Sequence, residues 1–261
     1  MLFRSQRISD NETIHAATYS EIVRMSFDDP AKVLTEILEI KESIARMEAV
    51  ARVFDDALLA SHQYPLGLVP NDQELFNRVY LFIVALFIME RIQFMASFAV
   101  TFTICASGLF QPIGQAIKKI CQDEYEVHVQ AGKAVLNILH ATEQGRIARE
   151  QTRATVETLF GEVIESEFKF VDYLFEDEKP LVGTNAEFLK KWVLFCGKDV
   201  VNFLGIDHTY GKLPKDNPMP HLEKWIDMNK LQAAPMEQDH GMYKVGVVID
   251  DSENGDFSDF F

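Results

Sequence analysis

The sequence predicts an all-α protein built as a bundle of long helices. Apolar residues recur at helical spacing over long stretches, as in Val33, Ile37, Ile40 and Ile44, and this period is typical of amphipathic helices. Turn-forming segments such as "YPLGLVPND" and "ASGLFQP" separate these stretches. Hydrophobic residues make up 48% of the 261 residues, which is enough to bury a sizeable core.

The helices are expected in a regular order along the chain. Pro30 and Pro112 each stand where a proline opens a helix, and "LEKWIDM" predicts one short helix after a turn-rich segment. The end of the chain, "IDDSENGDFSDFF", is acidic with aromatic residues at its tip and is expected to be a flexible tail. The long helices are predicted at about 9–27, 30–61, 72–106, 112–141, 144–175 and 184–204.

Composition excludes several classes of function. A net charge of −15 argues against binding to nucleic acid or to an anionic membrane surface. Cys105, Cys121 and Cys196 form no CxxC pair, so free thiols in a reducing, cytoplasmic compartment are expected. The start "MLFRSQRISDNE" lacks the apolar core of a secretory signal. The apolar run 79–89 is shorter than the roughly 18 residues of a spanning helix and is interpreted as a buried core helix.

Three of the predicted helices carry metal-type ligands among apolar residues. Glu12 and His15 are three residues apart, so they share a helix face, and Glu124 and His128 form a second pair. Glu90 follows the apolar run, and a buried carboxylate must be neutral, paired or bound to a cation. One Glu/His pair is weak evidence, but two pairs and a lone Glu are typical of di-iron and di-manganese carboxylate bundles. Such ligands suit iron or manganese better than zinc.

These segments resemble the radical-generating small subunit of class I ribonucleotide reductase. "SDNETIHAATYSEIVRMSFDDP" is similar to that family's first Glu/His helix, "MERIQFMASFAVTF" to its E-x-I-x-F-x-x-S-F-A helix, and "KKICQDEYEVHV" to its I-x-R-D-E-x-x-H helix. "DYLFEDEKPLVGTN" and "NPMPHLEKWIDMNKLQAAPMEQDHGMYKVG" resemble its later helices and its tail. The resemblance covers essentially the whole chain. It implies a ferritin-like helical domain over residues 1–230 and, over 231–261, a tail that binds a large subunit.

The resemblance also implies roles for individual residues. Tyr19 would hold the stable radical, unless it is simply a packed core tyrosine. Asp123 would hydrogen-bond a ligand histidine. Tyr243, six residues after Glu237, matches the tail tyrosine that passes the radical on, and both are candidate catalytic residues; the plain reading of Tyr243 is an ordinary tail residue. Two iron ions, or manganese, would be bound by Glu12, His15, Glu90, Glu124 and His128, and an apolar pocket around the radical would be formed by Phe94, Phe98 and Ile120.

The chain departs from the family pattern in two places. The family has a further ligand aspartate and a tryptophan upstream of the first Glu/His pair, whereas Met1 lies only eleven residues before Glu12 here. We therefore expect an incomplete N-terminal part and weak iron binding unless a separate polypeptide supplies the missing helix. One extra residue also separates Glu124 from His128, which predicts a π-bulge that keeps both on one face and turns Glu126 away.

The predicted function is that of the small subunit of ribonucleoside-diphosphate reductase. It would carry a dinuclear metal centre and a tyrosyl radical for the reduction of ribonucleotides to deoxyribonucleotides. The family forms homodimers, and "GDFSDFF" would dock on the large subunit, although an acidic tail can also serve only to keep a protein in solution. Two alternatives stay open: a non-catalytic or split-gene fragment that needs a separate N-terminal piece, and a ferritin-like di-iron oxidase without a partner subunit. The tail argues against the second.

Overall fold

The computed structural model describes residues 2–176, 181 and 183–228, and the described part is helical with no strand. Two π-helical segments interrupt long helical stretches: the first π-helix is Met89–Gln93 and the second is Asp123–His128. The all-α prediction is therefore confirmed for this part of the chain. The α-helices are α1 (Leu2–Ser26), α2 (Pro30–Glu39), α3 (Lys41–Gln63), α4 (Asp72–Ile88), α5 (Met95–Ala106), α6 (Gln111–Gln122), α7 (Val129–His140), α8 (Glu143–Leu174), α9 (Ala186–Leu204) and the short α10 (Glu223–Ile226).

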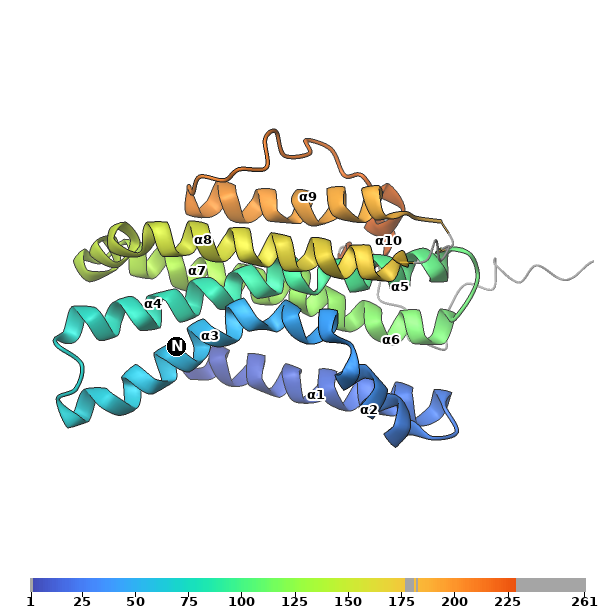
Figure 1. The fold of residues 1–261 in the computed structure, drawn as a ribbon, viewed down its shortest axis with the longest axis horizontal. Coiled ribbons are helices and arrows are strands. Elements are labelled where there is room, and N and C mark those ends of the chain that lie inside the picture. Colours follow the sequence, from blue (N-terminus) through green and yellow to red (C-terminus); the bar gives the residue numbers. More distant parts are fainter. Residues whose placement is uncertain (1, 177–180, 182, 229–261) are drawn as a thin grey trace, which may run out of the picture. The chain divides into compact units, whose positions relative to one another are not determined.

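Helix α4 lies at the centre of the bundle. It packs against α3, α7, α8 and α9, and α8 in turn packs against α3, α7 and α9, so these helices run beside one another in Figure 1. The sequence "LFIVALFI" makes α4 apolar on most sides, and Val84, Ala85, Phe87 and Ile88 are buried. A helix that is apolar all round is stable only when neighbours cover it.

The stretch from Asp72 to Ala106 is long and apolar enough to cross a membrane by composition alone. In the structure, 61% of its most apolar window is buried within the bundle, and the first π-helix interrupts it. It is therefore a core element of this helical protein, as predicted for residues 79–89.

Side chains at the helix starts explain where four of the helices begin. The carboxylate of Asp29 accepts a hydrogen bond from Lys32 N at 3.0 Å and Pro30 follows it, while the side chains of Asn71, Thr142 and Asn185 cap α4, α8 and α9 in the same way. Each cap satisfies a backbone N–H that has no partner inside the helix.

The helix predicted over residues 30–61 is divided in the structure. Ile40 adopts an extended conformation, with φ −76° and ψ 101°, and separates α2 from α3. The apolar period continues through this break, from Ile37 to Ile44, so the pattern of side chains carried no sign of the change in backbone direction. The single-helix prediction is wrong at this point.

Gly145, in the first turn of α8, is required by the close approach of another backbone segment. A Cβ atom at this position would lie 1.9 Å from the carbonyl oxygen of Leu139. We expect Gly145→Ala to lower the free energy of unfolding by about 1–3 kcal/mol or more, as overpacking does. Urea unfolding followed by circular dichroism measures this change.

Gly132 in α7 provides the matched control. A Cβ atom there would meet only the ring and Cβ of Phe87, at 3.5 Å or more, and alanine is about 1 kcal/mol better than glycine inside a helix. Gly132→Ala should therefore leave the protein equally or more stable. Equal stabilities of the two variants would contradict the close approach at Gly145.

Candidate metal centre

Four carboxylate and imidazole side chains meet where α1 approaches the two π-helices. Ligand atoms of Glu12, Glu90, Glu124 and His128 all lie within 4.8 Å of one another. Glu90, Glu124 and His128 are buried, while half of the Glu12 side chain is exposed. Residues far apart in the sequence thus form one compact set of oxygen and nitrogen donors.

Glu124 lies between the two imidazoles of the cluster. Its Oε2 is 2.8 Å from His128 Nδ1, and its Oε1 is 3.0 Å from His15 Nδ1. The His15 and His128 rings are 6.0 Å apart between their centroids. One carboxylate with an oxygen directed to each of two imidazoles is an arrangement that can bridge two metal ions.

Glu12 and Glu90 complete the cluster. Glu12 lies 3.4 Å from His128 Nδ1 through Oε1 and 3.6 Å from His15 Nδ1 through Oε2. Glu90 Oε2 lies 3.8 Å from His128 Nδ1. The five predicted ligands are thus all brought together, and each imidazole presents its Nδ1 atom to the carboxylates.

Asp123 orients one of the imidazoles. Its Oδ2 accepts a hydrogen bond from His15 Nε2 at 3.1 Å, which leaves Nδ1 of His15 directed at the cluster. A carboxylate that holds the far nitrogen of a ligand histidine fixes the ring and raises its basicity. This contact is the one expected for Asp123 from the sequence, although its part in catalysis stays a prediction.

The carboxylates raise the pKa values of both histidines. Burial lowers these values, but hydrogen bonds outweigh it and raise the pKa of His15 to about 11 and that of His128 to about 10. Both imidazoles are therefore protonated at neutral pH without metal. Because these values exceed 6.5, the stabilisation that they provide is fully present below pH 6.5 and is lost as the pH rises through 10 to 11.

The two buried carboxyl groups differ in their charge. Burial raises the pKa of Glu90, and a hydrogen bond to the nearby Glu124 raises it further. Burial acts in the same direction on Glu124, but hydrogen bonds from His128, His15 and Glu90 outweigh it and lower the pKa of Glu124. A neutral Glu90 beside an ionised Glu124 is the arrangement that avoids two buried like charges. This meets the expectation that a buried Glu90 is neutral, paired or bound to a cation.

The donor set fits a metal pair. Among the described residues, His15 Nδ1, Glu90 Oε2 and His128 Nε2 are buried atoms that no well-aligned hydrogen bond satisfies, although His15 Nδ1 and Glu90 Oε2 face charged groups of the cluster at 3.0 and 3.8 Å. Buried polar atoms without a partner are costly and call for an explanation. Three carboxylates and two imidazoles form a donor set suited to iron or manganese.

The second π-helix confirms the prediction drawn from the extra residue. The segment Asp123–His128 is π-helical, so Glu124 and His128 face the same way across four residues, whereas Glu126 is exposed. The first π-helix, at Met89–Gln93, carries Glu90 and was not predicted. Two of the three segments that supply ligands therefore depart from α-helical geometry, as is frequent at functional sites.

Tyr19 lies one turn beyond His15 on α1, and the structure does not enclose it. Burial raises the pKa of Tyr19 to about 12, to which Cys121 and Glu124 add, although 43% of its surface stays exposed. Phe98 and Ile120 are buried and Phe94 is half-buried. The shielding pocket therefore stays a prediction from the resemblance.

Two predicted catalytic residues, Glu237 and Tyr243, lie outside the described residues, as does the predicted tail. Their roles stay predictions.

Sequence reasoning missed a buried arginine beside the centre. The guanidinium of Arg91 lies 4.1 Å above the Tyr125 ring, and it donates hydrogen bonds to the Tyr125 hydroxyl and to Asp199, both at 3.2 Å. It links the residues that follow Glu90 and Glu124 in the two π-helices. The available signal was an arginine directly after Glu90, at the end of a long apolar run.

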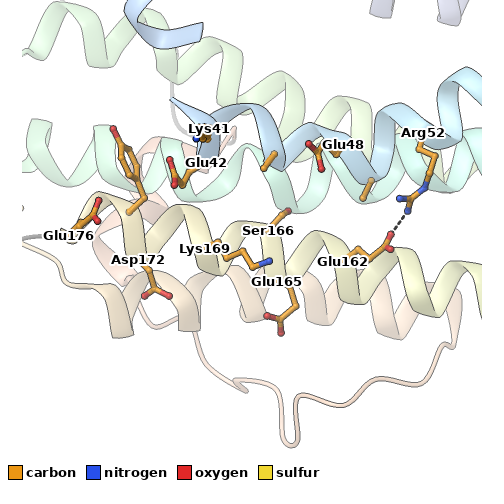
Figure 2. A pocket seen from close by; sticks show the side chains of 13 residues that line it. Lys41, Glu42, Glu48, Arg52, Glu162, Glu165, Ser166, Lys169, Asp172 and Glu176 are labelled. Carbon is orange, nitrogen blue, oxygen red and sulfur yellow. Dashed lines mark hydrogen bonds and ion pairs between the residues drawn. The ribbon is translucent and has the colours of Figure 1, made fainter. Parts of the chain in front are cut away.

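One hollow of the described molecule lies away from this centre. Figure 2 shows it between α3 and α8, with a volume of about 730 Å³. Acidic and basic side chains of both helices line it, and Arg52 pairs there with Glu162 at 2.5 Å. None of the predicted site residues lines it.

Comparisons with known proteins point to one family. Residues 5–218 match the family model of the ribonucleotide reductase small chain. The chain is 27% identical to the β subunit of ribonucleoside-diphosphate reductase 1 from Salmonella typhimurium and 28% identical to the β subunit from Haemophilus influenzae. Each alignment covers 96% of this chain and 69% of the relative. The β subunit of Enterobacteria phage T4 is 24% identical over 96% of this chain and 71% of that protein.

One solved structure shows the same fold. A Bacillus halodurans protein assigned to class I ribonucleotide reductase matches with a TM-score of 0.58 at 19% identity. The match covers 75% of this chain and 63% of that chain. The helical architecture is accordingly the ferritin-like bundle expected from the sequence.

Binding of a divalent metal to this centre should release protons. At about pH 7.5 both imidazoles are protonated, because their pKa values of about 11 and 10 lie above that pH, and a metal needs the free nitrogen lone pair. We expect about two protons per loaded centre from the histidines, and more where Glu90 is also protonated. Calorimetric titration with Mn²⁺ in buffers of different ionisation enthalpy measures this number.

The same titration has an internal control. His15→Ala should remove about one of the released protons, whereas a substitution of the exposed His62 on α3 should change nothing. Metal binding without proton release would show that the histidines are not ligands.

Proposed function

The chain belongs to the family of ribonucleotide reductase small chains, and we propose that it generates and stores an oxidising radical for a separate large subunit. Its relatives are β subunits of ribonucleoside-diphosphate reductases, so it is an oxidoreductase subunit. The observation that supports a catalytic role is the cluster of three carboxylates and two imidazoles between α1 and the two π-helices. A purely structural bundle has no use for so costly a group of buried polar side chains.

The proposed cofactor is a pair of iron ions, with manganese as the alternative. Glu12, His15, Glu90, Glu124 and His128 would hold it, and Glu124 would contribute both of its oxygens, because each of them points to a different imidazole. When bound, the metal pair would supply an oxidant, generated from molecular oxygen, for the formation of the radical. The burial of Glu90, Glu124 and His128 limits the access of water to the donors.

Tyr19 is the proposed radical site. With its pKa raised to about 12, its phenol stays protonated at neutral pH. Oxidation must therefore remove the hydroxyl proton together with the electron, because the radical cation of a phenol is a far stronger acid than the phenol itself. The position of Tyr19 one turn beyond His15 on α1 and the effect of the Glu124 charge on its pKa support this proposal.

The radical is proposed to leave through Asp123 and the tail. Asp123 connects His15 to the outside of the cluster, because its carboxylate bonds His15 Nε2 and is one third exposed. Tyr243 and Glu237, beyond the described residues, would continue the transfer to a cysteine of the large subunit, which reduces ribonucleotides to deoxyribonucleotides. A cytoplasmic location and a homodimer fit this role.

A second polypeptide is proposed to cover the outer side of α1. Glu12 and Tyr19 are both about half exposed, although one is a proposed ligand and the other a proposed radical site. A further segment packed there would shield Tyr19 and could add a carboxylate to the centre. Neither a non-catalytic fragment nor a ferritin-like di-iron oxidase without a partner subunit is favoured by the comparisons.

Tyr19→Phe tests the proposed radical site. After loading with Fe²⁺ and oxygen, the native chain should show a tyrosyl signal in electron paramagnetic resonance, and Tyr19→Phe should lack it while binding the same amount of metal. Tyr210, whose hydroxyl donates a hydrogen bond to Gly161 O in α8 at 3.0 Å, provides the control, and Tyr210→Phe should keep the signal. A signal that survives in Tyr19→Phe would place the radical elsewhere.

The proposed tail contact can be tested without enzymatic turnover. A synthetic peptide of residues 245–261 should compete with the full chain for the large subunit, and a scrambled peptide of the same composition should not. Removing residues 231–261 should abolish binding to the large subunit while leaving metal content unchanged. Undiminished binding after this truncation would refute the tail as the docking element.

A further inference from the structure

A buried ion pair joins α3 and α8 next to the first π-helix. Arg46 donates from Nε to Glu167 Oε1 at 2.6 Å and from Nη2 to Glu167 Oε2 at 3.0 Å. Glu167 is fully buried and Arg46 nearly so, and the guanidinium lies 3.9 Å above the Phe170 ring. A two-point contact of this kind holds the plane of the guanidinium in one orientation.

The same guanidinium reaches the end of the first π-helix. Its Nη2 donates to the carbonyl oxygen of Gln93, and its Nη1 donates to Ser97 Oγ at 3.2 Å. Gln93 returns a bond from its side-chain amide to the carbonyl oxygen of Arg46. Arg46 therefore holds the last residue of the π-helix and the first turn of α5 together.

This position matters because a π-helix is less favourable than an α-helix and persists where outside contacts support it. The Gln93 carbonyl lies three residues after Glu90 in the same segment. A change at Gln93 that restored α-helical winding would rotate Glu90 away from the cluster. Glu167 fixes the orientation of the Arg46 guanidinium. The guanidinium in turn donates a hydrogen bond to the Gln93 carbonyl, which belongs to the segment that carries Glu90.

We infer that Arg46 and Glu167 are positioning residues that hold the first π-helix and thereby aim the Glu90 carboxylate at the centre. They do not touch the cluster and act on it only through the backbone. The consequence for metal binding rests on the function proposed above, whereas the consequence for the π-helix does not.

The chain contains a matched control for this pair. Arg52 and Glu162 also join α3 to α8, at 2.5 Å, but with 65% and 41% of their side chains exposed. Figure 2 shows this pair at the hollow between the two helices. Arg46→Met and Arg52→Met therefore remove the same kind of contact from the same two helices, and only one of them lies at the π-helix.

Hydrogen exchange of the protein without added metal is the first measurement. In Arg46→Met, amides of residues 89–98 should exchange about tenfold faster or more, because the local opening of this segment becomes easier, while Arg52→Met should match the native protein. Unchanged exchange in Arg46→Met, or equal acceleration in Arg52→Met, would overturn the inference.

A double variant separates positioning from general stability. Arg46→Met with Glu167→Met replaces a buried ion pair by apolar side chains, which is often neutral for stability, but it leaves the Gln93 carbonyl without its donor. Fast exchange at 89–98 should therefore persist in the double variant even if its melting temperature returns to that of the native protein. Recovery of both together would show that the pair only stabilises the bundle.

Binding of Mn²⁺, followed by the loss of the free-ion resonance signal, is the second measurement. Arg46→Met should bind Mn²⁺ roughly 10–100-fold more weakly, which is the loss typical when a residue that orients a metal ligand is removed. Arg52→Met should bind Mn²⁺ as the native protein does. Equal Mn²⁺ affinity in both variants would overturn the positioning role. If the native chain binds no Mn²⁺ or Fe²⁺, the metal centre fails while the exchange experiment still decides the role of Arg46.

Discussion

The buried carboxylate of Glu124, held between two imidazoles, is the interaction on which the rest of the centre depends. Three carboxyl groups within a few ångströms would repel one another in an apolar bundle, and each isolated buried charge costs several kcal/mol. The structure avoids this cost with two protonated histidines and a neutral Glu90. The two positive imidazolium groups then face the ionised Glu124, which offsets repulsion among the carboxyl groups without metal.

The protonated groups of the cluster explain how the centre can exchange protons for metal ions. Loading with two divalent ions would remove the protons of His15, His128 and Glu90 and bring in four positive charges against three carboxylates. The carboxylate of Asp123, bonded to His15, compensates the remaining positive charge. Protons and metal ions are thus alternative partners for one set of donors, which is why the raised histidine pKa values oppose loading at low pH.

Much of this arrangement could be predicted from the sequence because its signals are local. Helical periods, proline starts and the Glu/His spacings are all read within a few residues, and the extra residue between Glu124 and His128 was enough to predict a π-helix. The break at Ile40 and the first π-helix left no such local signal. The second of these depends on Arg46, which lies 47 residues before Gln93 and meets it only in the folded bundle.

The described residues alone do not shield the ring of Tyr19 from solvent. An oxidised tyrosine persists only if reductants and water are kept from its ring, yet 43% of this residue is open. Tyr19 lies on α1, which packs against α2 and α6 and contributes no large buried side chain to the core among the described residues except His15. This helix supplies ligands from one face, and apolar residues such as Ile14 and Met25 stay exposed on it. Exposed apolar side chains of this kind are stabilised when another surface packs against them. Storage of a radical at Tyr19 therefore requires a working assembly in which another surface closes over α1.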